Sequence, residues 1–252
     1  MPDRAPVTEL RTSAILDELR RDGPPATLLV LGTDASGKDH VANVLEKAYA
    51  EAGHEAERRN SRFSGSVSQA TTSEDKGALS LLAERIFLRT FPILHRLLPL
   101  VVTVYLKLDG VLFRESSRPL IVVSHTALRV LALCLAHRHR TRDELRLPSS
   151  LERALVSLRE RTQPVTMVLD CEDATRRRRI REREKRGKAD HFDRFMARDS
   201  ERSERTEDFL VWIAVTYLGA VHVLNDDLDD DELLLAFHQA ATSVGPSAPI
   251  ES

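Results

Sequence analysis

The sequence is poor in cysteine, with only Cys134 and Cys171 among its 252 residues. It therefore has no disulfide framework, and we expect a reducing, cytoplasmic setting. The first ten residues, MPDRAPVTEL, lack the apolar segment of a secretory signal. Long hydrophobic runs are also missing, because the longest, LLPLVVTVYLKLDGVLF, is broken by Lys107 and Asp109. It is too short and too charged to span a bilayer, so we expect a helix that is buried or packs on the domain as a lid.

A large net charge of either sign is missing as well. Lysine and arginine together number 37 and aspartate and glutamate 39, which leaves a net charge of −2. Without a global basic field, we expect neither nucleic acid nor a membrane as a partner. The charge is nevertheless uneven, because residues 176–186 read RRRRIREREKR and residues 226–232 read DDLDDDE.

Five short runs are interpreted as strands: residues 27–31, 56–60, 120–124, 165–170 and 221–225. The runs LIVVS and VTMVLD show no polar alternation, which is typical of strands buried on both faces of a parallel sheet. Helical segments separate the runs, and such alternation requires right-handed crossovers. The pattern predicts an α/β fold with a parallel sheet of about five strands, flanked by helices.

The domain is expected to occupy residues 26–242. Residues 1–25 are interpreted as a helical extension, and residues 243–252 as a disordered tail. Residues 64–77 are rich in serine, threonine and glycine, which favours a surface loop. Residues 78–114 form a long helical region in this interpretation.

The segment after the first strand predicts a phosphate-binding loop. It reads G-T-D-A-S-G-K-D from Gly32 to Asp39 and matches G-x-x-x-x-G-K. Glycines let the backbone turn tightly and approach a phosphate, and inward N–H groups at a helix N-terminus form an anion nest. The predicted ATP-binding residues are Gly32, Asp34, Ala35, Ser36, Gly37, Lys38, Asp39 and His40. The alternative is a glycine-rich strand-to-helix turn with a surface lysine.

The basic block predicts an arginine lid. Arg179, Arg183 and Arg186 are spaced by four and three residues, so they share one helical face. Phosphoryl transfer needs positive charge around the reacting oxygens, so these arginines and Lys38 are the candidate catalytic residues. A solvated charged helix is the alternative.

The residues around this block resemble the lid of thymidylate kinases. The matching positions, within a lid over about residues 174–195, are Asp170, Ala174, Arg179-Ile180, Arg186-Gly187 and Asp193-Arg194-Phe195. Residues 206–233 resemble the last helix, last strand and adenine-side loop of that family. The resemblance covers roughly residues 26–240. It implies a P-loop kinase fold, ATP and Mg²⁺ as cofactors, and phosphoryl transfer to a nucleoside monophosphate or a related small phosphorylated acceptor.

Two positions depart from the family pattern. The third strand ends in Ser124-His125-Thr126, where thymidylate kinases have an aspartate that helps to hold magnesium and an arginine that grips the phosphates. In the phosphate loop, Asp39 replaces the serine or threonine that would bind magnesium. Because magnesium accepts carboxylates, Asp39 is the predicted metal ligand. The opposing hypothesis is that its charge repels triphosphate and marks a site that has decayed.

The acceptor side is the least defined by the sequence. The candidate acceptor-binding residues are Arg62, Arg85, His125 and Arg129. His125 also has a plain structural interpretation, as a hydrogen-bonded residue at a strand end. Phe63 is compatible with base stacking or with the core.

Two other classes of protein stay open. One is a catalytically inactive nucleotide-binding or regulatory protein, and the other is an assembly module. The second would use apolar faces in residues 78–114 to form a homodimer, which would not exclude kinase activity.

Overall fold

The computed structural model describes residues 27–33, 35–64, 86–87, 89–116, 120–139, 141–142, 145–187, 189 and 191–243. The expected helical extension over residues 1–25 lies outside this part of the chain, as do Asp34, Arg85 and residues 244–252 of the expected tail.

Five parallel strands form one sheet, which confirms the predicted α/β class. They are β1 (Thr27–Gly32), β2 (Ala56–Ser61), β3 (Leu120–His125), β4 (Val165–Asp170) and β5 (Val221–Leu224). The order is β2-β3-β1-β4-β5, and every pairing is parallel. The central strands β1, β3 and β4 are the continuous apolar runs because helices cover both of their faces. The charged strand β2 lies at an edge, where less apolar surface is needed.

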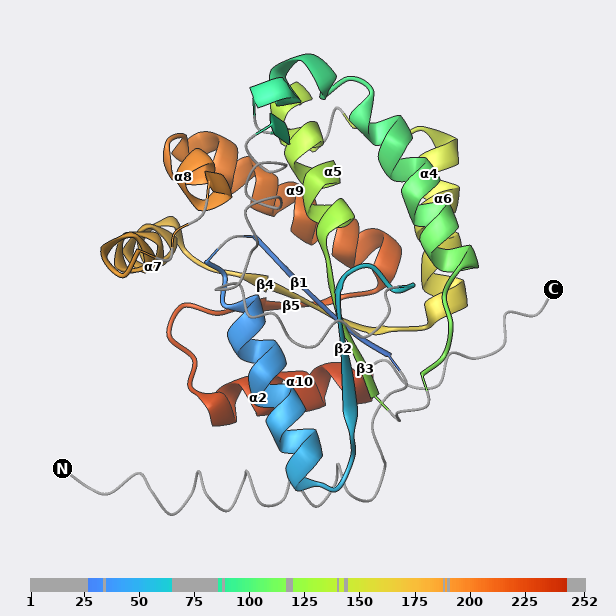
Figure 1. The fold of residues 1–252 in the computed structure, drawn as a ribbon, viewed down its shortest axis with the longest axis vertical. Coiled ribbons are helices and arrows are strands. Elements are labelled where there is room, and N and C mark those ends of the chain that lie inside the picture. Colours follow the sequence, from blue (N-terminus) through green and yellow to red (C-terminus); the bar gives the residue numbers. More distant parts are fainter. Residues whose placement is uncertain are drawn as a thin grey trace.

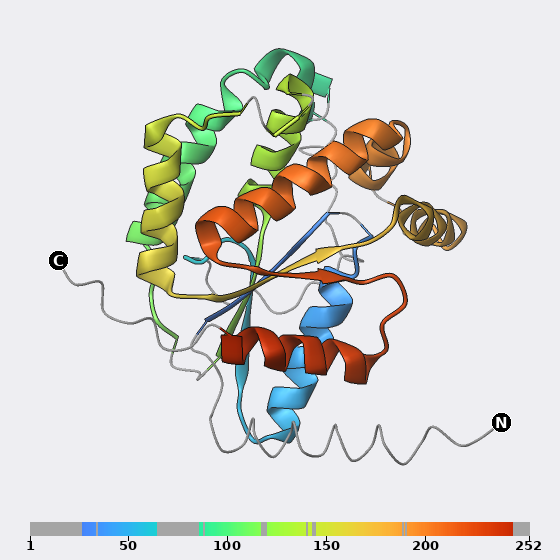
Figure 2. The same cartoon turned by 180° about the vertical axis from the view of Figure 1, so that it is seen from behind.

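Helices cover both faces of this sheet (Figures 1 and 2). The described helices are α2 (Lys38–Glu51), α4 (Leu98–Val111), α5 (Thr126–Arg138), α6 (Ser149–Thr162), α7 (Asp173–Lys185), α8 (His191–Ala197), α9 (Ser200–Leu218) and α10 (Asp230–Ser243). Helices α2 and α10 lie on one face, and α4, α5, α6 and α9 lie on the other. Helix α7 lies beyond the carboxyl end of β4 and carries most of the basic block.

Alternate residues of β1 divide the core into two layers. Leu28 and Val30 pack toward α2 and α10, whereas Leu29 and Leu31 pack toward α5, α6 and α9. All four side chains are at most 2% exposed. Because parallel strands share one direction, the carboxyl ends of β1, β3 and β4 meet at the same edge of the sheet. Ligands of open α/β sheets bind at this edge.

The helical region before β3 is interrupted. A helical segment ends at Leu94, residues 95–97 form a turn, and α4 follows. Helix α4 packs on α5 and α6 with one face only. The expectation of a buried helix is therefore correct for that face and wrong for the face with Leu100, Val104 and Leu108, which are more than half exposed. Within the described residues, no helix combines the length and the apolar character needed to cross a membrane.

Candidate functional site

The predicted phosphate loop lies between β1 and α2, at the carboxyl edge of the central strand. Its backbone turns sharply, because Ala35 has a φ of 61° and Gly37 a φ of 90°. The Ser36 hydroxyl donates a hydrogen bond of 2.9 Å to the carbonyl of Thr33, which closes the turn. A strand, a tight turn and a helix N-terminus therefore follow one another as the sequence predicts.

Both glycines of the loop are required by their neighbours. A Cβ on Gly32 would lie 2.2 Å from the Ser36 hydroxyl oxygen. A Cβ on Gly37 would lie 2.5 Å from Nδ2 of Asn225, in a backbone conformation that already favours glycine. From the sequence, these glycines are predicted to let the backbone come close to a phosphate. The structure adds a second reason, which is that two side chains already occupy the space.

Two side chains from distant segments hold the loop. The amide of Asn225, which is 3% exposed at the end of β5, donates a 2.8 Å hydrogen bond to the carbonyl of Ser36. Arg179 donates to the carbonyls of Ala35 at 3.2 Å and Asp226 at 3.0 Å. Sequence reasoning missed Asn225, although a polar residue directly after an apolar strand was a usable signal. It assigned Arg179 to the transition state, whereas the guanidinium binds the loop backbone here.

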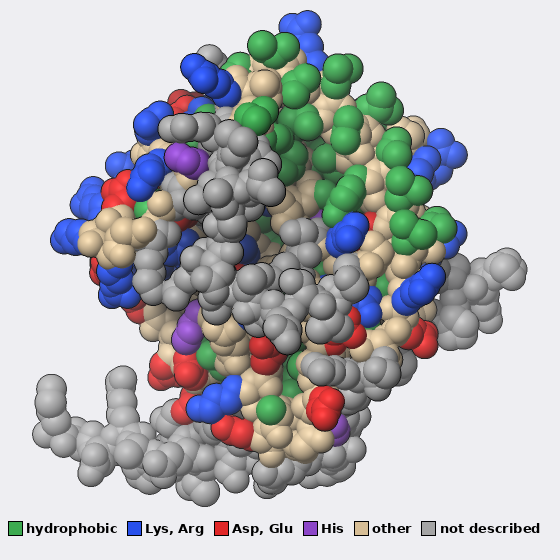
Figure 3. All heavy atoms as spheres, in the orientation of Figure 1, with side chains coloured by type: hydrophobic (Ala, Val, Ile, Leu, Met, Phe, Trp, Pro, Cys, Tyr) green, Lys and Arg blue, Asp and Glu red, His purple; other side chains and the backbone are tan. Residues whose placement is uncertain are grey.

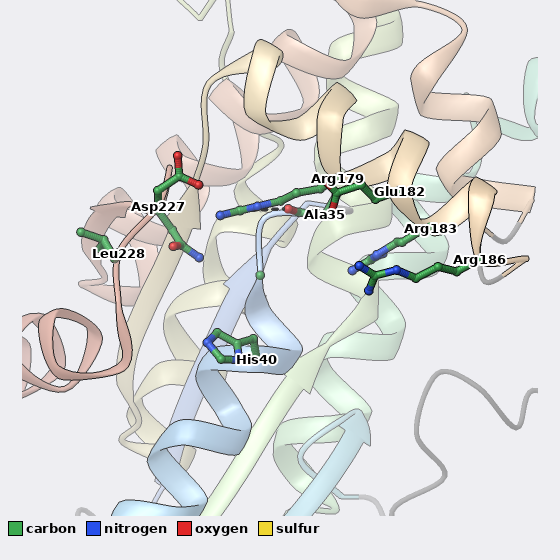
Figure 4. A pocket seen from close by; sticks show the side chains of 10 residues that line it. Ala35, His40, Arg179, Glu182, Arg183, Arg186, Asp227 and Leu228 are labelled. Carbon is green, nitrogen blue, oxygen red and sulfur yellow. Dashed lines mark hydrogen bonds between the residues drawn. The ribbon is translucent and has the colours of Figure 1, made fainter.

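A cavity of about 420 Å³ lies between this loop and α7 (Figure 4). Its described lining residues are Ala35, Gly37, His40, Arg179, Glu182, Arg183, Arg186, Asn225, Asp227 and Leu228. The volume is in the range of small-molecule sites. All three predicted lid arginines line it together with part of the loop. Lys38 and Asp39 are not among the described residues that line it.

The cavity arginines differ in their partners. The guanidinium of Arg183 is 3.4 Å from the carboxylate of Asp193, which is 2% exposed. Arg186 reaches from α7 in the same direction as Arg183 (Figure 4), and no ion pair or hydrogen bond joins its side chain to the described residues. Glu182 also lines the cavity. Of the three described arginines that line the cavity, Arg186 is therefore the most available for an anionic ligand.

Arg176, at the start of the basic block, has a structural role instead. It is 2% exposed, pairs with Glu207, and donates hydrogen bonds to Ser203 and to the carbonyl of Cys171. Glu207 also accepts a 2.9 Å bond from Thr33 in the loop. This buried pair connects α7 and α9 to the phosphate loop.

The predicted metal ligand Asp39 lies in the first turn of α2 and is not among the described residues that line the cavity. Its carboxylate is 3.3 Å from the guanidinium of Arg58 on β2 and 4.0 Å from the ammonium of Lys38. Its side chain is 48% exposed. Among the described residues, no three histidine, cysteine or acidic side chains gather as a metal cluster. Asp39 supplies one carboxylate, and Mg²⁺ in phosphate sites is held by one or two carboxylates together with the phosphates of the substrate, so Asp39 stays a predicted metal ligand.

Of the predicted acceptor residues, Arg85 lies outside the described part of the chain, and the other three have different surroundings. Arg62 is exposed, and Arg129 stacks on the Phe192 ring with its guanidinium carbon 4.3 Å from the centroid. Phe63 is fully buried, so it belongs to the core. His125 is 4% exposed and its Nε2 lies 3.0 Å from Asp109. For His125, the geometry matches the structural interpretation.

Asp109 connects three elements at this edge of the sheet. From α4, its carboxylate accepts hydrogen bonds from the amides of Phe63 and Ser64, the Ser64 hydroxyl and the ring of His125. Burial raises the pKa of Asp109, but these bonds outweigh it, and the pKa falls to about 2. The sequence singled out Asp109 only as an interruption of an apolar run.

We expect the Asp109 carboxylate to contribute acid-sensitive stability. Its pKa is depressed, so the contribution is complete above the unfolded-state pKa near 4 and is lost as the pH falls through about 2. In urea unfolding, the stability difference between wild type and Asp109→Asn should shrink by roughly 2 kcal/mol between pH 5 and pH 2. Asp208→Asn, which changes an exposed carboxylate on α9, is the control. A difference independent of pH would contradict the assignment.

Comparison with protein-family models and with curated proteins found no relative of the chain. The resemblance to thymidylate kinases therefore stays a prediction from the short sequence motifs. No protein-family model matches the chain, and no curated protein matches it significantly in sequence.

Proposed function

We propose that the protein catalyses ATP- and Mg²⁺-dependent phosphoryl transfer to a nucleoside monophosphate or a related small phosphorylated acceptor, on a P-loop kinase fold. One observation carries the proposal. A cavity is bounded on one side by a glycine-containing loop at the end of the central strand. On the other side it is bounded by Arg179 and Arg183 of α7 and by Arg186, directly after this helix. A turn leading into a helix N-terminus opposite a row of guanidinium groups is suited to a polyphosphate.

The residues then have distinct tasks. Arg179 and Asn225 order the loop, so its N–H groups are positioned before a ligand arrives. In this proposal Lys38, in the first turn of α2, binds the donor phosphates, and Arg183 and Arg186 spread positive charge over the transferred group. ATP supplies the phosphoryl group, and Mg²⁺ neutralises charge on its oxygens. Such a reaction relies on positioning and charge, so it demands no protein nucleophile.

A second candidate is an inactive nucleotide-binding protein. It is favoured by the pairing of Asp39 with Arg58, and by the burial of His125 where thymidylate kinases carry functional residues. The Asp39 carboxylate is then engaged by Arg58, and the His125 ring is buried, so neither side chain is free to act on a nucleotide. The cavity itself is equally suited to this candidate.

Calorimetry and a turnover assay test both candidates. We expect ATP to bind in the presence of magnesium, and ADP release to increase when the right monophosphate from a panel of ribo- and deoxyribonucleotides is added. Lys38→Ala should lose binding, which assigns the signal to this loop. Binding without turnover on any acceptor would favour the second candidate. No binding at millimolar ATP with magnesium would contradict both.

A further inference from the structure

A buried carboxylate contacts the start of the predicted phosphate loop. Glu207 of α9 is 4% exposed, and one of its oxygens accepts a 2.9 Å hydrogen bond from the hydroxyl of Thr33, the first residue after β1. The other oxygen pairs with the guanidinium of Arg176 on α7. Thr33 and Arg176 are themselves buried, so this chain of contacts is shielded from solvent. We call these three residues the Glu207 bridge.

Both ends of the Glu207 bridge are fixed by further hydrogen bonds. The carbonyl of Thr33 accepts the 2.9 Å bond from the Ser36 hydroxyl that closes the loop. At the other end, Arg176 donates to the Ser203 hydroxyl at 3.1 Å and to the carbonyl of Cys171 at 2.9 Å. Because separating buried charges leaves each of them uncompensated, the loop, α9 and α7 are held in one arrangement.

Burial sets Arg176 apart from the rest of the basic block. Figure 3 shows basic and acidic side chains gathered on the surface over α7, whereas Arg176 is buried. One helical turn further, Arg179 donates to the carbonyl of Ala35 (Figure 4). The next turn carries Arg183, which lines the cavity. Helix α7 therefore holds the loop at two points, directly through Arg179 and indirectly through the Glu207 bridge.

Networks of buried hydrogen bonds and ion pairs can carry coupling between elements of a protein. We propose that the Glu207 bridge couples the phosphate loop to α7, so that a displacement of one displaces the other. Its consequence for the site rests on the proposed function: a phosphate-bearing ligand bound at the loop also orders α7 and fixes the position of Arg183 at the cavity. The members of the bridge are thus positioning residues, because they act through the loop and through Arg183.

A purely stabilising role is the alternative, and the chain offers a matched control for it. Glu57 and Arg59 of β2 form a second buried ion pair, with their side chains 2.7 Å apart. Arg59 also donates to the carbonyls of Phe63 and Arg114, which lie outside the loop and α7. Glu57→Gln should therefore lower the melting temperature and leave α7 unchanged.

Hydrogen exchange of the full chain, read by mass spectrometry of its peptides, tests the coupling. Thr33→Val keeps the shape of the side chain and removes the hydroxyl, so it cuts the bridge while the buried ion pair stays. Without ligand, we expect the amides of α7 to exchange about tenfold faster in this variant, because a hydrogen bond to a charged group is lost. Thr33→Ser should restore the exchange of the wild type, and α6 should exchange equally in all three proteins.

ATP with magnesium supplies the second comparison. Binding should slow the exchange of α7 in the wild type, whereas Thr33→Val should bind ATP with little protection of α7. Unchanged α7 exchange in ligand-free Thr33→Val would overturn the coupling, as would equal acceleration in α6 or in Glu57→Gln, or full protection of α7 by ATP in Thr33→Val. If the wild type binds no ATP, the proposed function is contradicted, and the ligand-free comparison still decides whether the loop and α7 are coupled.

Discussion

Arg186→Ala is expected to lower kcat about a hundredfold while changing the KM for ATP much less, because the lost guanidinium acts mainly on charge that develops in the transition state. Arg186 lines the cavity and has no side-chain partner among the described residues, so its removal leaves no buried group unpaired. Stability should therefore stay close to that of the wild type. Steady-state kinetics with the acceptor found in the turnover screen provides the measurement.

Matched variants separate this effect from a general loss of positive charge. Arg181→Ala removes the same charge from an exposed position of α7 that is not among the residues lining the cavity, and it should keep the wild-type kcat. Arg183→Ala should also lower kcat, but it removes the Arg183 contact of the buried Asp193 carboxylate and should therefore also lower the melting temperature. If Arg186→Ala keeps the wild-type kcat, the basic block is only a solvated helix face.

Asp39→Ala is expected to abolish most of the magnesium-dependent part of ATP binding, since we take Asp39 to be a metal ligand. Asp39→Ser should keep part of it, because a hydroxyl also binds magnesium. Asp39→Asn keeps the shape but loses the charge, so it should weaken binding when magnesium is present. The measurement is an ATP titration of each variant in magnesium and in chelator.

The opposing hypothesis predicts the opposite change in ATP affinity when Asp39 is replaced. If the carboxylate only repels phosphate, Asp39→Asn and Asp39→Ser should both tighten ATP binding, with or without magnesium. Tighter binding by the Asn variant in magnesium would end the metal-ligand hypothesis.

The contact between Asp39 and Arg58 sharpens the same test. Arg58 competes with a metal for the carboxylate, so Arg58→Ala should strengthen the magnesium-dependent binding if Asp39 is a ligand. If the carboxylate is merely repulsive, removing its counter-charge should weaken binding in both buffers. The two hypotheses therefore predict opposite changes in ATP affinity for Arg58→Ala as well.

Local patterns in the sequence were enough to predict the elements that hold the site. The runs that became β1, β3 and β4 are apolar on both faces, and this property belongs to each segment alone. The turn between β1 and α2 was predictable because Gly32 and Gly37 mark a change from strand to helix at a fixed spacing. The common face of Arg179, Arg183 and Arg186 follows from helical periodicity alone, and all three line the cavity.

Only the tertiary structure decided the partners of these residues, because contacts between distant segments leave no local signal. Asn225 meets Ser36 from 189 positions away, and Arg179 meets Ala35 from 144 positions away. Asp39 reads as an unpaired carboxylate in the sequence, yet Arg58 reaches it because β2 runs beside α2.

The two faces of α4 also differ only through tertiary contacts. Its sequence is apolar nearly all round, so periodicity could not say which residues would be buried. Packing on α5 and α6 covers one face and leaves the other face, with Leu100, Val104 and Leu108, exposed. Asp109 breaks the apolar run on the inner face, where the ends of β2 and β3 supply the donors that make a buried carboxylate tolerable.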